Sequence, residues 1–152
     1  MLKRFIGYAV VSSLAAMMMP AQASANESLR AFKSAYAFDE TVSRLEKGIK
    51  EKGMSIFTVI DHAQAARDAG LDMPATKVIV FGNPKAGTPL MKKHPTLALD
   101  LPLRVLVTQG SEQVSVVMHT YQSTFDQLNL PVEDGVPLGG AEKLVQSLVT
   151  AP

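Results

Sequence analysis

The chain has 152 residues, with 15 basic and 14 acidic side chains and no cysteine. The absence of cysteine excludes thiol catalysis, CxxC redox chemistry, covalent c-type haem attachment and thiolate zinc sites. The near-neutral charge gives no support to nucleic-acid binding, which needs a basic surface to neutralise phosphates.

The first 25 residues have the pattern of a secretory signal peptide. A basic start, Met-Leu-Lys-Arg, precedes 15 uncharged residues (5–19), and two overlapping Ala-x-Ala sites follow in residues 21–25. The apolar run is shorter than the ~20 residues that a bilayer-spanning helix needs. We therefore expect cleavage at one of these sites and export to the periplasm or beyond. The alternative is an uncleaved anchor helix.

Cleavage after Ala25 would leave 127 of the 152 residues, which is the size of a single domain covering 26–152. Loss of Lys3 and Arg4 would leave 13 basic against 14 acidic residues, a net charge of −1. We expect no stable membrane anchor on this mature chain.

The first predicted elements are a strand, a helix and a second strand. Residues 29–36 alternate loosely between polar and apolar, as in a strand. Residues 38–52 predict a helix that Gly53 ends, because apolar side chains recur on one face. That face contains Phe38, Val42, Leu45 and Ile49. Residues 55–60, rich in β-branched side chains, predict the next strand.

A short helix and a third strand follow. Asp61 is a favoured N-cap, the next residues are rich in alanine, and Gly70 provides a C-terminal stop. Residues 77–81 are mostly apolar, which indicates a strand in the interior of a sheet or covered on both faces.

Residues 81–91 read FGNPKAGTPLM and predict a turn into a helix. Thr88 is a favoured N-cap, and Pro89 at the first helical position loses no hydrogen bond. The helix would cover residues 90–94, with Pro95 beyond its end.

The rest of the chain predicts a hairpin and a final helix. Strands at 103–109 and 113–119 flank a turn at 110–112, and Phe125 and Leu128 suit a helical turn. After Gly139-Gly140, apolar residues at 141, 144, 145 and 148 follow helical spacing. The element order predicts an α+β fold, a mostly antiparallel sheet with helices packed on one face.

The sequence resembles the domain of unknown function 302 (DUF302) family over roughly residues 31–118. The resemblance is carried by five segments: Asp39-Glu40-Thr41, Asp61-His62, Ala65-Ala66 with Gly70-Leu71, FGNPKAGTPLM, and Leu99-Asp100-Leu101-Pro102-Leu103. It implies a single β-α-β(4)-α domain of TATA-binding-protein-like type, often dimeric, with no established biochemical function. Family members tend to have an Asn-Asp-Pro-like turn after the hairpin, which this chain lacks at 117–121.

FGNPKAGTPLM is the first candidate site. It is not a Walker A loop, because no Gly-Lys-Ser/Thr closes it. Unpaired amides at the start of a helix at Thr88, with Lys85 nearby, would suit an anion. A purely structural interpretation is also open: Gly82 and Gly87 would supply special dihedrals, Pro84 and Pro89 would restrict φ, and Asn83 would bond local backbone groups. The candidate ligand-binding residues here are Phe81, Gly82, Asn83, Pro84, Lys85, Gly87 and Thr88.

Asp61-His62 is the second candidate. Neutral imidazole in the first turn of a helix can bind a metal or act as a base. The structural alternative is an N-cap aspartate followed by a surface histidine. A site formed by His62, His94 and His119 has no support from spacing, since no His-Glu-x-x-His or similar motif is present.

The leading hypothesis is an exported, non-enzymatic domain that binds a small ligand or a partner protein, as a homodimer. Its pocket would lie between the FGNP loop and the Asp61-His62 turn. The alternative is a metal- or haem-binding protein, or an enzyme, that uses His62. The sequence names no cofactor and no reaction.

Overall fold

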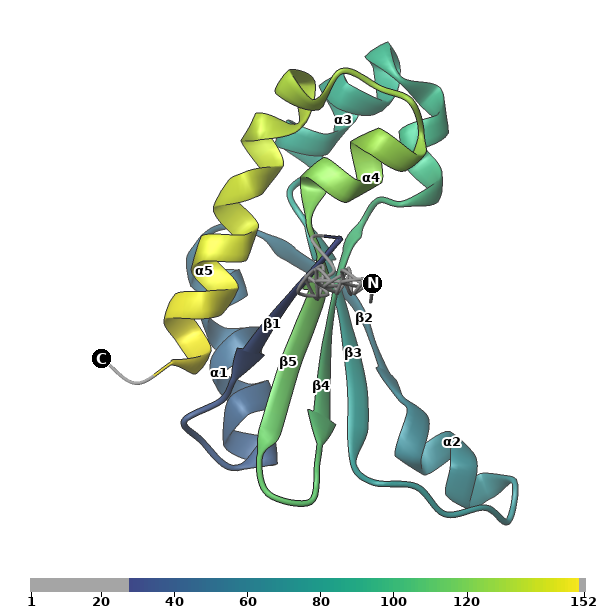
Figure 1. The fold of residues 1–152 in the computed structure, drawn as a ribbon, viewed down its shortest axis with the longest axis vertical. Coiled ribbons are helices and arrows are strands. Elements are labelled where there is room, and N and C mark those ends of the chain that lie inside the picture. The colour runs from purple at the N-terminus through teal and green to yellow at the C-terminus, as the bar shows by residue number, and fades with distance from the viewer. Residues whose placement is uncertain (1–27, 151–152) are drawn as a thin grey trace, which may run out of the picture.

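The computed structural model describes residues 28–150, so the expected signal peptide and its cleavage sites lie outside the described residues. Within residues 28–150, five strands form one antiparallel sheet in the order β1-β5-β4-β3-β2 (Figure 1). The strands are β1 (Leu29–Lys33), β2 (Ser55–Asp61), β3 (Thr76–Gly82), β4 (Leu103–Gln109) and β5 (Val114–His119).

Two helices cover one face of this sheet. They are α1 (Phe38–Glu51) and α5 (Gly139–Val149), which lie side by side in Figure 1. Alternate strand residues point toward them because successive side chains of a strand face opposite ways. The main core is made by buried residues of both helices and the three inner strands: Val42, Leu45, Ile49, Ile79, Phe81, Val105, Val107, Val114, Val116, Met118, Ala141, Val145 and Val149.

The remaining helices lie at the two ends of the sheet. At one end, α3 (Pro84–Lys93), η1 (Pro95–Leu99), α4 (Tyr121–Gln127) and η2 (Val132–Leu138) enclose a second apolar cluster. That cluster contains the buried residues Leu90, Leu97, Phe125 and Leu138. At the other end, α2 (His62–Asp68) lies in the connection between β2 and β3 (Figure 1). Residues 28–150 contain no helix with the length and apolar character that a membrane span requires.

The expected β-α-β(4)-α order is confirmed, with short helices inserted between its strands. Gly53 and Gly70, predicted to end helices, have φ of 72° and 74°, the left-handed backbone that glycine adopts at helix ends. β1 ends at Lys33 rather than at residue 36. β3 lies inside the sheet, as expected, but only one of its faces is covered by helices, and Val78 and Val80 are half-buried.

The predicted start of the third helix is wrong. α3 begins at Pro84 with Asn83 as its N-cap, so Thr88 and Pro89 lie inside the helix. The Oδ1 of Asn83 accepts the Lys85 backbone N–H at 3.0 Å. Asn83-Pro84 and Thr88-Pro89 are both cap-plus-proline pairs, and both suit a helix start. The earlier pair follows directly on β3, and burial of Leu90 stabilises a helix that contains Pro89.

Candidate functional site

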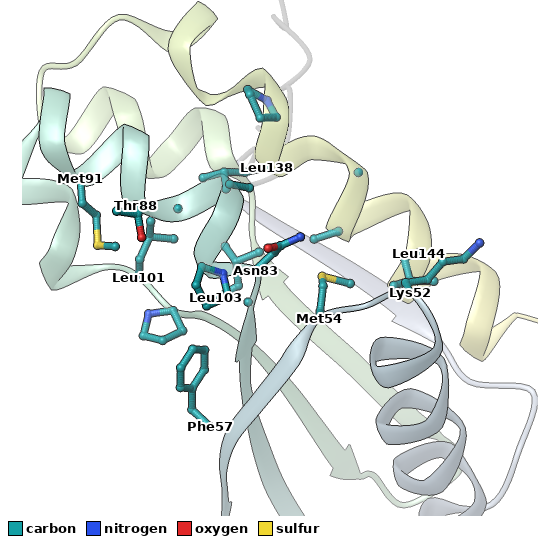
Figure 2. A pocket seen from close by; sticks show the side chains of 18 of the residues that line it. Lys52, Met54, Phe57, Asn83, Thr88, Met91, Leu101, Leu103, Leu138 and Leu144 are labelled. Carbon is teal, nitrogen blue, oxygen red and sulfur yellow. The ribbon is translucent and has the colours of Figure 1, made fainter.

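A cavity of about 740 Å³ lies at the end of the sheet where β3 leads into α3. Figure 2 shows its side chains converging from β2, α3, the segment before β4, and α5. It is lined by Lys52, Met54, Phe57, Gly82, Asn83, Pro84, Ala86, Gly87, Thr88, Met91, Leu101, Pro102, Leu103, Pro137, Leu138, Gly140, Ala141, Lys143, Leu144 and Ser147. Ligand pockets in proteins usually measure 300–1,000 Å³, so the cavity is large enough for a small molecule.

The wall of this cavity is mainly apolar. Met54, Met91 and Leu144 contribute flexible side chains, and Phe57, which is 54% exposed, stands at its edge. Small residues of α3 and α5 keep the space between them open. A Cβ added at Gly140 would meet no atom within 4 Å, and one added at Gly87 would come no closer than 3.7 Å to Leu101.

Five residues of the FGNP candidate set line the cavity: Gly82, Asn83, Pro84, Gly87 and Thr88. Phe81 does not, because its ring is fully buried in the main core. Lys85 is exposed on α3 outside the cavity lining. The expected anion site at a Thr88 helix start is wrong, because that helix starts five residues earlier and Thr88 is not its cap.

Asn83 has two features that suit a binding residue. Its carbonyl oxygen caps α3, which holds the side chain in one orientation. Within residues 28–150, its amide nitrogen has no protein hydrogen-bond partner, and Figure 2 shows the side chain among those of the cavity. An amide N–H₂ offers two donors to a ligand. Neither Gly82 nor Gly87 has a positive φ, the special dihedral that glycine adopts most readily, and both line the cavity.

Asp61 and His62 lie far from this cavity, which corrects the expectation of a shared pocket. In the β2–β3 pairing, Ser55 is opposite Gly82 whereas Asp61 is opposite Lys77. Asp61 lies six residue steps along β2 from Ser55, which corresponds to roughly 20 Å at about 3.3 Å per residue.

Asp61 has a structural role at its end of the sheet. Its Oδ1 accepts the Gln64 backbone N–H at 2.8 Å as the N-cap of α2, and its Oδ2 lies 3.4 Å from Lys77 Nζ. The hydrogen bond from Gln64, and then the contact with Lys77, hold the pKa of the Asp61 carboxyl below its usual range. His62 is the exposed first residue of α2.

The three histidines do not come together. His94 is the C-cap of α3, and its Nε2 lies 2.8 Å from Asp134 Oδ2. His119 ends β5, exposed beside a recess of about 50 Å³ that Asp100 and Arg104 also line. In residues 28–150 no three His, Cys, Asp or Glu side chains are grouped so that they could hold a metal ion.

Most residues that line the cavity, those of α5 included, were not candidates from the sequence. Gly140, Lys143, Leu144 and Ser147 follow the spacing i, i+3, i+4, i+7 and so share one face of α5. That spacing is visible in the sequence, and it differs from the buried stripe of Ala141, Val145 and Val149. The sequence does not show, however, that this face lies opposite Asn83 and Met54.

Comparisons with known proteins agree with this fold. The family model described as "Domain of unknown function DUF302" matches residues 30–148. The chain therefore belongs to the DUF302 family. The crystal structure of an uncharacterised conserved DUF302 protein from Bacillus stearothermophilus superposes with a TM-score of 0.74 at 16% sequence identity. The superposition covers 80% of this chain and 97% of that one, and it shows a shared fold.

Curated relatives match over a shorter stretch. Fluoride-specific ion channel FluC 1 of Brucella suis biovar 1 is 43% identical over 83 residues, 54% of this chain and 33% of that protein. FluC 2 of Brucella melitensis biotype 1 matches with the same identity over 31% of its length. The matched stretch thus spans about a third of the length of these relatives. The name "fluoride-specific ion channel" belongs to those whole proteins.

Proposed function

We propose that this chain is an exported, non-enzymatic domain that binds a small, mainly apolar molecule in the cavity between α3 and α5. The single observation that carries the proposal is the cavity itself: about 740 Å³, with mostly apolar walls and a few polar groups such as Asn83. This is the usual composition of a small-molecule site. Export is supported by the signal-peptide pattern of the first 25 residues.

A neutral fluorescent probe tests the proposal. N-phenyl-1-naphthylamine gains fluorescence in apolar sites, and we expect the purified protein to bind it at one saturable site. Ala86→Phe should abolish most of this binding, because Ala86 lines the cavity and a phenyl ring would occupy it. Gly140→Phe should do the same from α5, where an added Cβ meets no atom within 4 Å.

The matched control is Ala65→Phe, which places the same ring on the exposed surface of α2, outside the cavity. Circular dichroism melting shows whether each variant is folded. The proposal fails if the wild-type protein binds no probe, or if folded Ala86→Phe and Gly140→Phe proteins bind it as well as Ala65→Phe does.

We also propose that the chain forms a homodimer through the sheet face that the helices leave open. Register pairing places one apolar row across all five strands of the described sheet: Ile60, Val78, Leu106, Val117 and Ala31. Ile60 at the end of this row is 42% exposed. An apolar row is self-complementary, and a second copy would remove it from water.

A further inference from the structure

The charged side chains that line the cavity are the basis for an inference about the chemical class of a ligand. This inference rests on the binding function proposed above. Of the described residues that line the cavity, the two charged ones are Lys52 and Lys143, and no carboxylate lines it. Lys52 caps the end of α1, where its backbone N–H donates to the Gly48 carbonyl at 3.1 Å, and Lys143 lies on α5.

Acidic neighbours in the sequence do not neutralise these lysines. Glu51 lies 3.8 Å from Lys47. Glu142 lies 3.6 Å from Arg30 Nε and accepts the Tyr121 backbone N–H at 3.0 Å. Within residues 28–150, neither Lys52 nor Lys143 forms a salt bridge. Two positive charges therefore border an apolar cavity without a salt-bridge partner among residues 28–150, and an anion bound in the cavity would be attracted to them.

The cavity is divided into a charged end and an apolar end. Figure 2 places Lys52 beside Leu144 at one end and Phe57 and Met91 at the other. Lys143, the neighbour of Leu144 in the sequence of α5, also lines the cavity. A ligand that fills this space would have an apolar body toward Phe57 and Met91.

We propose that the ligand is an amphiphile with an apolar chain or ring body and one anionic head group held by Lys52 and Lys143. Lysine acts as a compact point charge with rotatable donors, unlike the planar fork of arginine. The site would therefore accept a carboxylate, a phosphate or a sulfate head group.

The experiment measures displacement of the neutral probe N-phenyl-1-naphthylamine by decanoate, decyl phosphate, 1-decanol and decyltrimethylammonium, which share one chain length. We expect both anions to displace the probe at about tenfold lower concentration than decanol, and the cation to be weakest. Acetate and inorganic phosphate, which lack the apolar body, should not displace it. The displacing concentrations of decanoate and decyl phosphate are then compared. The lower of the two shows whether the site prefers a fatty carboxylate or a phosphorylated amphiphile.

Substitution of both lysines tests their role. Lys52→Met with Lys143→Met should bring decanoate and decyl phosphate to within about twofold of decanol while probe binding persists. The matched control is Lys85→Met with Lys92→Met, two exposed α3 lysines outside the cavity lining, which should keep the anion preference. Added salt should reduce the preference in the wild-type protein, since partly exposed charges are screened.

Two results would overturn the inference while the proposed function stands. One is equal displacement of a bound probe by anionic and neutral chains, and the other is an anion preference that persists in the Lys52→Met, Lys143→Met protein. Absence of any probe binding would instead contradict the proposed function itself.

Discussion

The imidazole Nε2 of His94 lies 2.8 Å from the Oδ2 of Asp134, and Lys93 Nζ lies 2.7 Å from the same oxygen. These contacts join the carboxyl end of α3 to η2. Both elements border the cavity, α3 through Thr88 and Met91 and η2 through Leu138. The Lys93 hydrogen bond, and next the His94 hydrogen bond, hold the pKa of the Asp134 carboxyl below its usual value of 3.8.

Replacement of Asp134 by asparagine should therefore change acid stability. A carboxyl with a lowered folded-state pKa stabilises the fold fully above its unfolded-state pKa and loses that contribution as pH falls through the folded-state value. We expect Asp134→Asn to melt a few degrees lower than wild type at about pH 7. The difference should narrow as pH falls below 3.8. Melting curves by circular dichroism across this range measure it, and a constant difference at every pH would contradict the assignment.

Gly135 should tolerate no side chain. A Cβ placed there would lie 2.7 Å from Tyr121 Cδ2 and 2.9 Å from Phe125 Cε2, and the Phe125 ring is fully buried. We expect Gly135→Ala to lower the free energy of unfolding by about 1–3 kcal/mol, the usual cost of overpacking. Urea denaturation measures this value.

Gly140→Ala is the matched control for that substitution. An added Cβ at Gly140 meets no atom within 4 Å, and the residue lies in the first turn of α5. Alanine lowers the entropy of the unfolded chain and favours helix, so Gly140→Ala should stabilise the protein by about 0.4–1 kcal/mol. Equal effects at the two positions would show that packing at Gly135 is looser than described.

Asp61→Ala should destabilise the protein without changing ligand binding. The variant loses the cap to the Gln64 backbone N–H and the contact with Lys77, so its melting temperature should fall by a few degrees. The cavity lies at the other end of β2, so probe affinity should stay within about twofold of wild type. Melting and probe titration on the same sample measure both quantities.

His62→Ala separates the binding proposal from the alternative function based on His62. His62 is exposed at the start of α2, so we expect no loss of stability and unchanged probe affinity. Titration of wild-type and variant protein with zinc, copper and haem provides the second readout. Tight binding of one of them that disappears in His62→Ala would favour the metal or haem alternative.

Leu106→Lys should dissociate the proposed homodimer. Leu106 lies in the middle of the apolar row on the open sheet face, opposite Val78 and Val117. A lysine there would be buried without a partner in a face-to-face dimer, which is costly. Light scattering coupled to size exclusion should show a dimer for wild type and a monomer for the variant. Ser43→Lys, on the exposed surface of α1, is the control and should remain dimeric.

Local pattern was enough to predict the fold class and the order of the strands and main helices. The apolar spacing of α1, the β-branched run of β2 and the glycines at 53 and 70 each correspond to the element that the structure contains. These signals act over a few residues, through side-chain period and turn dihedrals, so they can be interpreted without the rest of the chain. Local pattern did not predict the start of α3, because Asn83-Pro84 and Thr88-Pro89 suit a helix start equally well. The burial of Leu90 depends on contacts with distant residues, which local pattern does not show.

The β-α-β(4)-α order and the candidate FGNP segment can be found in the amino-acid sequence alone. The surroundings of that segment depend on how distant parts of the chain pack together. The tertiary structure brought Lys52, Met54 and the Lys143–Leu144 face of α5 to the FGNP segment, and it placed Asp61 at the far end of the sheet. Strand register and helix docking depend on contacts between residues far apart in the chain, and no local period specifies those contacts.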